Sequence, residues 1–149
     1  MNLLTGEYFN ILDEKGRISI PARLREKLPG SLLHLTRGNG RCIWAFPPEE
    51  WERYSRRWMR SSTQTAEQRS KILHKFIAPM QDMEIDKAGR LMIPPSLRDY
   101  AGLSRDCVVA GIGDTIEIWD AERYRANQEA IDGDFSGLMA ETSAADFFG

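Results

Sequence analysis

Short apolar segments with alternating polar positions recur along the chain, and this pattern is typical of β-strands separated by turns. Early in the sequence, GEYFNIL and RISI flank the turn DEKG, while SLLHLTR and RCIWAF flank GNG. Between the two pairs lies PARLREKL, whose leading proline suits the first position of a helix. The pattern therefore predicts a unit with the order β-β-α-β-β.

The same order of elements recurs later in the chain, in DMEI, RLMI, PSLRDYA, CVVAGI and TIEIW. The opening turns also match in sequence: DEKGRISIP at 13–21 and DKAGRLMIP at 86–94 share the string Asp-x-x-Gly-Arg-apolar-x-Ile-Pro, 73 residues apart. At this offset identical residues recur as far as Glu49 and Glu122, and no gap is needed to align them. The chain therefore contains an internal duplication, for which we expect one constant offset.

One unit of four short strands and a short helix is too small to enclose a core. Two such units can do so if their strands interleave. We therefore expect an α+β fold, mainly β, in which residues 5–52 and 78–125 behave as the two halves of a fused homodimer.

Residues 53–77, between the units, predict a pair of helices. Trp51, Tyr54 and Trp58 recur at helical spacing, and we expect this aromatic stripe to pack in the core or between subunits. Thr65 opens the sequence TAEQ, a capping box that starts the second helix.

The end of the chain predicts a short helix over DAERYRANQEA with Asp120 as its N-cap. Residues 126–149 form an acidic tail, and beyond Ala130 this tail is rich in Gly, Ser and Ala and contains no Lys or Arg. We expect the segment beyond Ala130 to be poorly ordered.

The composition indicates one compact domain or two intertwined halves, because the chain has 149 residues and is 42% hydrophobic. No apolar run approaches the roughly 18 residues that cross a bilayer. The start of the sequence also lacks the basic and apolar regions of a signal peptide. We therefore expect no membrane association and a cytoplasmic location.

The net charge of −2 conceals a strong asymmetry between the two halves. Residues 1–75 contain 14 Lys and Arg against 8 Asp and Glu, whereas residues 76–149 contain 6 against 14. Such a split indicates a side that binds a polyanion. The alternative is a dipolar surface that favours self-association.

Residues for catalysis or metal binding are few. Cys42 and Cys107 lack the spacing of a zinc site, and we expect both to be reduced core residues. Neither a Gly-x-x-x-x-Gly-Lys phosphate loop nor a Gly-x-Ser-x-Gly elbow is present in the sequence. We therefore expect no enzymatic activity, no cofactor, no metal and no small-molecule substrate.

The Asp-x-x-Gly-Arg turns are the best candidate site, and two interpretations are open. In the structural interpretation Asp13 caps the turn, Gly16 forms it and Arg17 pairs back to Asp13, and Asp86, Gly89 and Arg90 act in the same way. In the functional interpretation the cations bind DNA. Lys15 and the run Arg17, Arg23, Arg25 and Lys27 crowd the first turn, and a phosphate backbone would relieve their repulsion. Arginine also suits bidentate contact with guanine, and a β-hairpin fits the major groove.

With these strings at this spacing, the chain resembles the MraZ family of bacterial transcription regulators. Each half is similar to the AbrB-type swapped-hairpin DNA-binding domain. The resemblance runs from about Gly6 to about Arg125. It rests on GEYFNILDEKGRISIPARLRE, LTRGNGRCIWAFPPEEW, EIDKAGRLMIPPSLRDYAGL and GIGDTIEIWD.

The resemblance implies a pseudo-dimeric swapped-hairpin β-barrel that assembles into a ring-like homo-oligomer. It also implies a cytoplasmic, nucleoid-associated repressor. Such a repressor binds short repeated sites in double-stranded DNA upstream of its own operon of division and cell-wall genes. In the family the Asp-x-x-x-Arg segment carries DNA binding, which maps onto Asp13 to Arg17 and onto Asp86 to Arg90.

The two copies of the turn are unequal, because Lys15 corresponds to Ala88 and Glu14 to Lys87. We therefore expect the first turn to dominate DNA binding, with Arg90 and Lys87 supporting it. The alternative function is an AbrB-like protein-interaction module of the antitoxin type, in which the acidic tail holds a partner protein.

Overall fold

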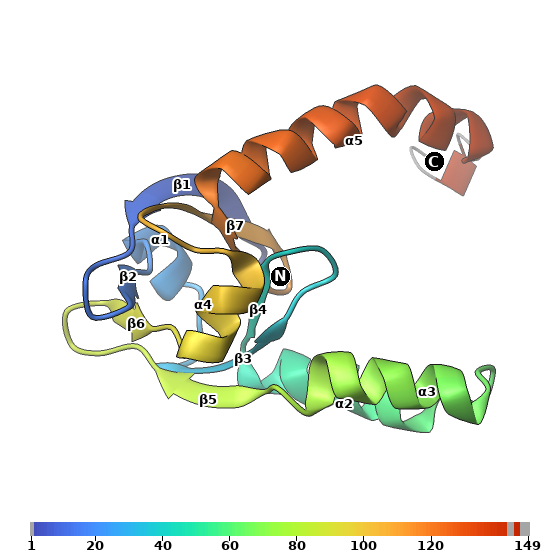
Figure 1. Cartoon of the computed structure of the whole chain (residues 1–149), viewed down its shortest axis with the longest axis horizontal. Helices are drawn as coiled ribbons and strands as arrows, with labels where there is room; N and C mark the ends of the chain where they lie inside the picture. The colour runs from blue at the N-terminus through green and yellow to red at the C-terminus, as the bar shows by residue number, and fades with distance from the viewer. Residues whose placement is uncertain (1, 143–144, 147–149) are drawn as a thin grey trace.

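The computed structural model describes residues 2–142 and 145–146. The strands within these residues are β1 (Leu4–Ile11), β2 (Arg17–Ser19), β3 (Leu32–Arg37), β4 (Ile43–Phe46), β5 (Gln81–Glu84), β6 (Arg90–Met92), β7 (Asp106–Gly113) and β8 (Ile116–Asp120). The helices are α1 (Ala22–Arg25), α2 (Pro48–Arg60), α3 (Ala66–Ile72), α4 (Pro95–Ala101) and α5 (Ala121–Glu141), and α3 continues into a π-helical segment, η1 (Leu73–Ile77). The predicted order β-β-α-β-β is therefore present twice (Figure 1).

The strands of the two units interleave. One antiparallel sheet has the order β1-β7-β8-β4-β3-β5, and β2 pairs with β6 in a separate two-stranded ribbon. Each strand thus has a hydrogen-bonded neighbour in the other unit. The α+β, mainly β, fold is confirmed. No ladder joins the sheet to the ribbon within the described residues, so closure into a barrel stays a prediction.

Strand register reveals a pseudo-two-fold relation between the units. Ile18 pairs with Leu91 in the ribbon, and Trp44 pairs with Glu117 in the sheet. Each pair joins residues 73 positions apart, so each residue lies opposite its own counterpart. The pseudo-two-fold axis therefore passes through both pairs.

The prediction of one uninterrupted offset is wrong for β3 and β7. Asn10 pairs with Cys107, while Met83, the counterpart of Asn10, pairs with Leu33. Leu33 therefore corresponds to Cys107, 74 residues later. A slip of one residue turns every side chain of a strand to the other face. One extra residue before β7 therefore makes Cys107 the counterpart of Leu33, and both are buried in the core. The uninterrupted offset would instead match Cys107 to the half-buried His34.

Both units contribute to a single hydrophobic core. Its fully or almost fully buried members occur largely as counterparts from the two units: Ile18 and Leu91, Ile20 and Ile93, Leu24 and Leu97, and Ile43 and Ile116. Burial of apolar area is the main favourable term in folding. Neither unit could retain this core alone, because half of its side chains belong to the other unit.

The helical insert packs on its own chain through the predicted aromatic stripe. Trp58 stacks on Phe76 with ring centroids 4.8 Å apart, and Tyr54 lies 5.2 Å from Phe46. The stripe was expected to pack in the core or between subunits, and in this structure it packs within the chain, against β4 and η1. The predicted capping box is confirmed at Thr65, whose hydroxyl accepts a hydrogen bond from the Gln68 amide.

The C-terminal helix is longer than the sequence predicted. Asp120 caps it as expected, accepting a hydrogen bond from the Arg123 amide, but α5 continues to Glu141 through residues expected to be poorly ordered. Helix nucleation is costly and propagation is not, so a capped and anchored first turn favours extension. Packing of Tyr124 on Trp119, with ring centroids 5.9 Å apart, provides this anchor. Residues 143–144 and 147–149 of the predicted tail lie outside the described residues.

The shared core predicts that counterpart mutations in the two units weaken the same folding transition. Leu24→Ala and Leu97→Ala should each lower the free energy of unfolding by about 2–5 kcal/mol, because each leaves a cavity in the core. Urea denaturation followed by both tryptophan fluorescence and circular dichroism measures this effect. The control Met59→Ala, at a side chain that is 52% exposed, should change the free energy by less than about 0.5 kcal/mol. Two separate transitions would contradict the shared core.

Candidate nucleic-acid interface

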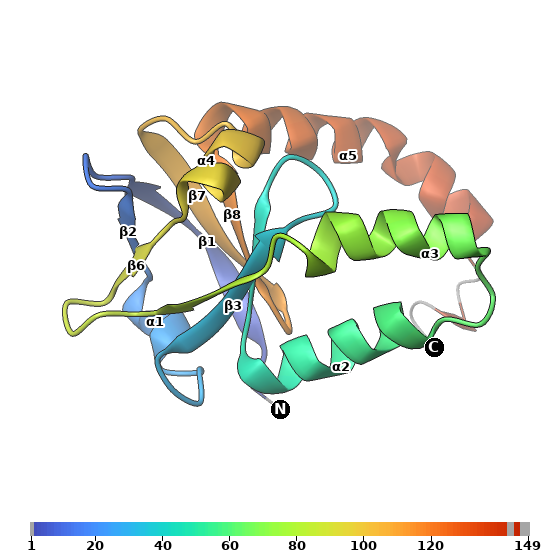
Figure 2. The ribbon, with the colours of Figure 1, turned by 60° about the horizontal axis from the view of Figure 1, so that its bottom comes forward.

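The two Asp-x-x-Gly-Arg turns lie at the same end of the molecule. They connect β1 to β2 and β5 to β6, and both project away from the free ends of α2, α3 and α5 (Figures 1 and 2). Because β2 and β6 pair antiparallel, with Arg17 opposite Met92 and Ser19 opposite Arg90, one turn lies at each end of this three-residue ladder. The Ile20 amide donates to the Gly89 carbonyl and the Ile93 amide donates to the Gly16 carbonyl, both at 2.8 Å. The backbone of each unit therefore fixes the turn of the other.

Each turn is built around its aspartate. One carboxylate oxygen of Asp13 accepts hydrogen bonds of 2.9 Å from the amides of Lys15 and Arg17. Gly16 closes the turn with φ +82°, a left-handed conformation that favours glycine. The second turn repeats this geometry, since Asp86 accepts bonds of 2.9 Å from the amides two and four residues later.

The arginine that ends each turn pairs with the same aspartate. Arg17 Nε donates to the second carboxylate oxygen of Asp13 at 3.0 Å. In the second turn Arg90 Nε lies 3.3 Å from Asp86 Oδ2, as an ion pair without hydrogen-bond geometry. The side chains of Arg17 and Arg90 are 25% and 37% exposed, and within the described residues their terminal nitrogens form no hydrogen bond. Each Arg is thus held by one edge and free to bind a ligand with the other.

The electrostatics of the turns follow from these bonds. The hydrogen bond from the Arg17 amide is the main cause that lowers the pKa of Asp13 below its ordinary value of 3.8, and the Arg17 side chain adds to it. The Arg90 amide has the same leading effect on the pKa of Asp86. Both carboxylates are therefore ionised at neutral pH and anchor a cationic guanidinium beside them.

Two further arginines support the turns: Arg25, which was expected among the cations beside the first turn, and Arg98, which was not predicted as a site residue. The Arg98 guanidinium packs over Gly16, and the Arg25 guanidinium packs over Gly89, so close that an added Cβ would lie 2.8 Å from either group. Arg25 Nε also donates to the Ile20 carbonyl at 2.9 Å. Each arginine thus crosses to the turn of the other unit. Their identity at the 73-residue offset was the signal that could have revealed them.

The remaining predicted cations have different positions. Lys15 and Lys87 are exposed within the turns themselves. Arg23 is exposed on α1 and, within the described part of the chain, makes no ion pair or hydrogen bond with either turn. The structure therefore places Arg17, Arg90, Lys15 and Lys87 in the two turns at one end of the molecule, whereas Arg23 lies on α1 without a bond to either turn in the described residues.

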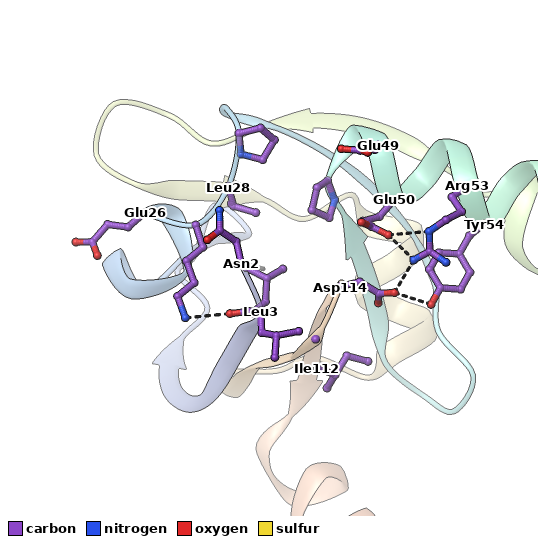
Figure 3. Close-up of a pocket in the computed structure, with 15 residues that line it drawn as sticks. Asn2, Leu3, Glu26, Leu28, Glu49, Glu50, Arg53, Tyr54, Ile112 and Asp114 are labelled. Carbon is purple, nitrogen blue, oxygen red and sulfur yellow. Dashed lines mark hydrogen bonds and ion pairs between the residues drawn. The ribbon is translucent and has the colours of Figure 1, made fainter. Parts of the chain in front are cut away.

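A hollow of about 770 Å³ lies away from the turns, between the N-terminal segment, the end of α1, the start of α2 and the β7–β8 hairpin (Figure 3). Arg53 and Tyr54 both donate to Asp114 Oδ2 at 2.8 Å. The residues that line the hollow include no Ser, Cys or His. The hollow therefore offers no nucleophile–base pair of the kind that hydrolases use.

The cysteines are buried, as predicted, and burial is the main cause that raises the pKa of both thiols, to about 11 at Cys107. Residues 2–142 and 145–146 contain no group of His, Cys, Asp and Glu that could hold a metal ion. Within the same ranges, no helix is both long enough and apolar enough to cross a membrane.

The geometry predicts that Gly16→Ala distorts the first turn. A side chain at φ +82° is strained, and its Cβ would collide with the Arg98 guanidinium. The substitution should lower the free energy of unfolding by about 1–3 kcal/mol, measured by urea denaturation. Gly30→Ala is the matched control, because nothing lies within 4 Å of a Cβ there. Equal effects at the two glycines would contradict this account of the turn.

Comparison with known proteins agrees with the duplicated architecture. The model of a family described as "MraZ protein, putative antitoxin-like" matches the chain twice, over residues 3–72 and 76–145. The starts of the two matches are 73 residues apart, which is the offset of the repeated turns.

Curated relatives match the chain over most of its length. A protein of Treponema denticola is 44% identical over 89% of this chain and 92% of its own, and one of Treponema pallidum is 46% identical over 90% of each. A Frankia alni protein is 39% identical over 93% of this chain and 96% of its own. Each is named "Transcriptional regulator MraZ". Two family matches that together span nearly the whole chain, with relatives of this similarity, show that the chain belongs to the MraZ family.

Proposed function

We propose that this protein is a transcriptional regulator that binds double-stranded DNA in a sequence-specific manner through its two Asp-x-x-Gly-Arg turns. The observation that carries the proposal is the pairing of β2 with β6, which presents Arg17 and Arg90 at one end of the molecule, each oriented by its own aspartate. The names of the curated relatives support the same function.

Recognition would use the free edges of the two guanidinium groups. A two-stranded β-ribbon fits the major groove, which is about 12 Å wide, and arginine there donates two hydrogen bonds to guanine. Asp13 and Asp86 limit the conformations of the two arginines before DNA arrives. Less conformational entropy is then lost on binding than a flexible side chain would lose.

The lysines and Arg23 would contact phosphates, which position the protein on the duplex without reading its sequence. Lys15 has Ala88 as its counterpart, whereas Lys87 replaces Glu14. Each turn thus carries one lysine at a different position. The first turn, with Arg23 following in the same unit, would contribute more of the affinity.

A single pair of turns covers only a few base pairs, which is too little for useful specificity in a genome. We propose that a ring-like homo-oligomer engages several short repeated sites at once, since linked binding raises avidity by roughly 10²–10⁴. Sites upstream of the protein's own operon of division and cell-wall genes would place the ring over the promoter. Repression would follow from blocking the promoter, in the cytoplasm and at the nucleoid, and would need no cofactor.

Replacement of Arg17 tests the proposal. Arg17→Gln should reduce discrimination between DNA upstream of the protein's own gene and a scrambled duplex by about 1–3 kcal/mol, which is the value of one bidentate contact. Arg90→Gln should have a smaller effect. Fluorescence anisotropy measures both, and Arg69→Gln, at an exposed arginine of α3, is the control. If Arg17→Gln discriminates as well as the wild type, the assignment of the turn is wrong.

A second candidate function is an antitoxin-type module that holds a partner protein. The observation that favours it is on α5, where Ile131, Phe135 and Leu138 lie four and three residues apart and are each 44–52% exposed in an acidic segment. Such spacing places the three side chains on one helix face, as in helices that dock into apolar grooves.

This second function predicts that the double variant Ile131→Ser, Phe135→Ser loses a co-purifying protein while its affinity for duplex DNA stays unchanged. Affinity purification with mass spectrometry, together with anisotropy, measures the two effects. Glu129→Gln, at an exposed residue of the same helix, is the control. Recovery of the same proteins with wild type and double variant would rule out α5 as the partner-binding segment.

A further inference from the structure

Three cations surround one aromatic ring outside the turns. Tyr100, at the end of α4, has Arg41 Cζ at 5.0 Å from its ring centroid, and Arg37 Cζ and Lys75 Nζ at 5.4 Å. The three side chains come from the β3–β4 loop, β3 and η1, which are separate in sequence. The fold therefore assembles this group, which we name the Tyr100 patch.

The cations of the Tyr100 patch have no anionic partner within the described residues, where none of them makes an ion pair or a side-chain hydrogen bond. At these distances the face of the aromatic ring attracts each cation. One ring, however, cannot neutralise three positive charges, which repel one another. A bound anion would remove this repulsion.

The hydroxyl group of Tyr100 holds the β3–β4 loop against the ring. Tyr100 Oη lies 2.8 Å from the Gly40 carbonyl and 3.1 Å from the Gly38 carbonyl, and it donates to this pair of oxygens. These bonds fix the loop that carries Arg41. The cations therefore converge on a rigid support, and a ligand need not organise them on binding.

The surroundings of the patch suit a ligand that lies along the surface. Beside Arg37 is a hollow of about 550 Å³, and its lining includes the exposed residues His74, Gln81 and Ser96. No aspartate or glutamate lines this hollow. An extended chain of phosphates fits an open, cationic surface of this kind.

We propose that the Tyr100 patch binds the phosphate backbone of the duplex that the turns hold, as a second contact that does not read sequence. This inference rests on the proposed DNA-binding function. Helix α4 lies between β6 and the β3–β4 loop in both views (Figures 1 and 2). The seven residues of α4 span about 10 Å, and the five residues 90–94 before it span at most about 17 Å. The patch is thus within about 27 Å of Arg90, or roughly eight base pairs along a duplex.

The Tyr100 patch combines residues of both units and the insert, but its aromatic ring comes from the second unit. The counterpart of Tyr100 at the 73-residue offset is Lys27, whose Nζ donates to the Leu3 carbonyl at 2.9 Å. The first unit thus has a lysine bound to backbone at the position where the second unit has an aromatic ring. The additional backbone contact would therefore lie on one side of the paired turns.

Salt dependence of DNA binding tests the inference. The triple variant Arg37→Gln, Arg41→Gln, Lys75→Gln should lose affinity by the same factor for the upstream duplex and for a scrambled duplex. The slope of log K against log salt concentration should fall by about 0.9 for each phosphate contact removed. The matched control is Arg56→Gln, Arg57→Gln, Arg60→Gln on α2, which removes the same charge and should leave the slope unchanged.

If the triple variant does not fold, Arg41→Gln alone serves, because Arg41 is exposed on its loop and its loss should lower the slope by about 0.9. A slope equal to that of the wild type overturns the inference. Binding of inorganic phosphate at the Tyr100 ring can be followed by NMR. Saturable phosphate binding together with an unchanged DNA slope would also overturn the inference, because the patch would then be a site for small anions.

The same measurements separate this inference from the proposed function. Loss of discrimination in Arg17→Gln with an unchanged slope in the triple variant would overturn only the role of the Tyr100 patch. If the wild type binds the upstream and scrambled duplexes equally well, the sequence-specific function fails. The slopes on the scrambled duplex would still decide whether the patch contacts phosphates.

Discussion

The short ladder between β2 and β6 is the interaction on which the rest of the structure depends. Its central pair, Ile18 with Leu91, lies on the pseudo-two-fold axis and is fully buried, so the ladder also forms part of the shared core. The same ladder carries one turn at each of its ends and lets each unit hydrogen-bond to the glycine of the other. Core stability and the geometry of the candidate DNA-binding surface therefore have one physical origin.

The aspartates show how a local cost can serve the proposed DNA-binding surface. A carboxylate beside DNA repels phosphates, yet Asp13 and Asp86 each hold two backbone amides and one guanidinium in place. Arg98 and Arg25 then add positive charge beside each turn and pack against its glycine. The turns are thus rigid, and positive charge surrounds each anchoring carboxylate.

Features set by local sequence could be predicted, as could the interleaving of the two units, but the register between distant strands and the side-chain contacts between distant segments could not. The order of elements and the caps at Thr65 and Asp120 depend on neighbouring residues, and the structure confirms them. The inserted residue that aligns Cys107 with Leu33 depends on partners in the other unit, so sequence identity alone concealed it. The Tyr100 patch is a similar case, because its members are separated by up to 63 positions in the chain.

The fused pair of units has an evolutionary consequence. A dimer of identical chains must present the same side chains at both of its sites, so its targets tend to be palindromic. In this chain each turn is encoded separately, and Lys15 and Ala88 show that the two have already diverged. A mutation can therefore alter one half of the proposed recognition surface and leave the other half unchanged. Target preference in such a protein can drift in single steps, without the simultaneous change of two half-sites that a symmetric dimer requires.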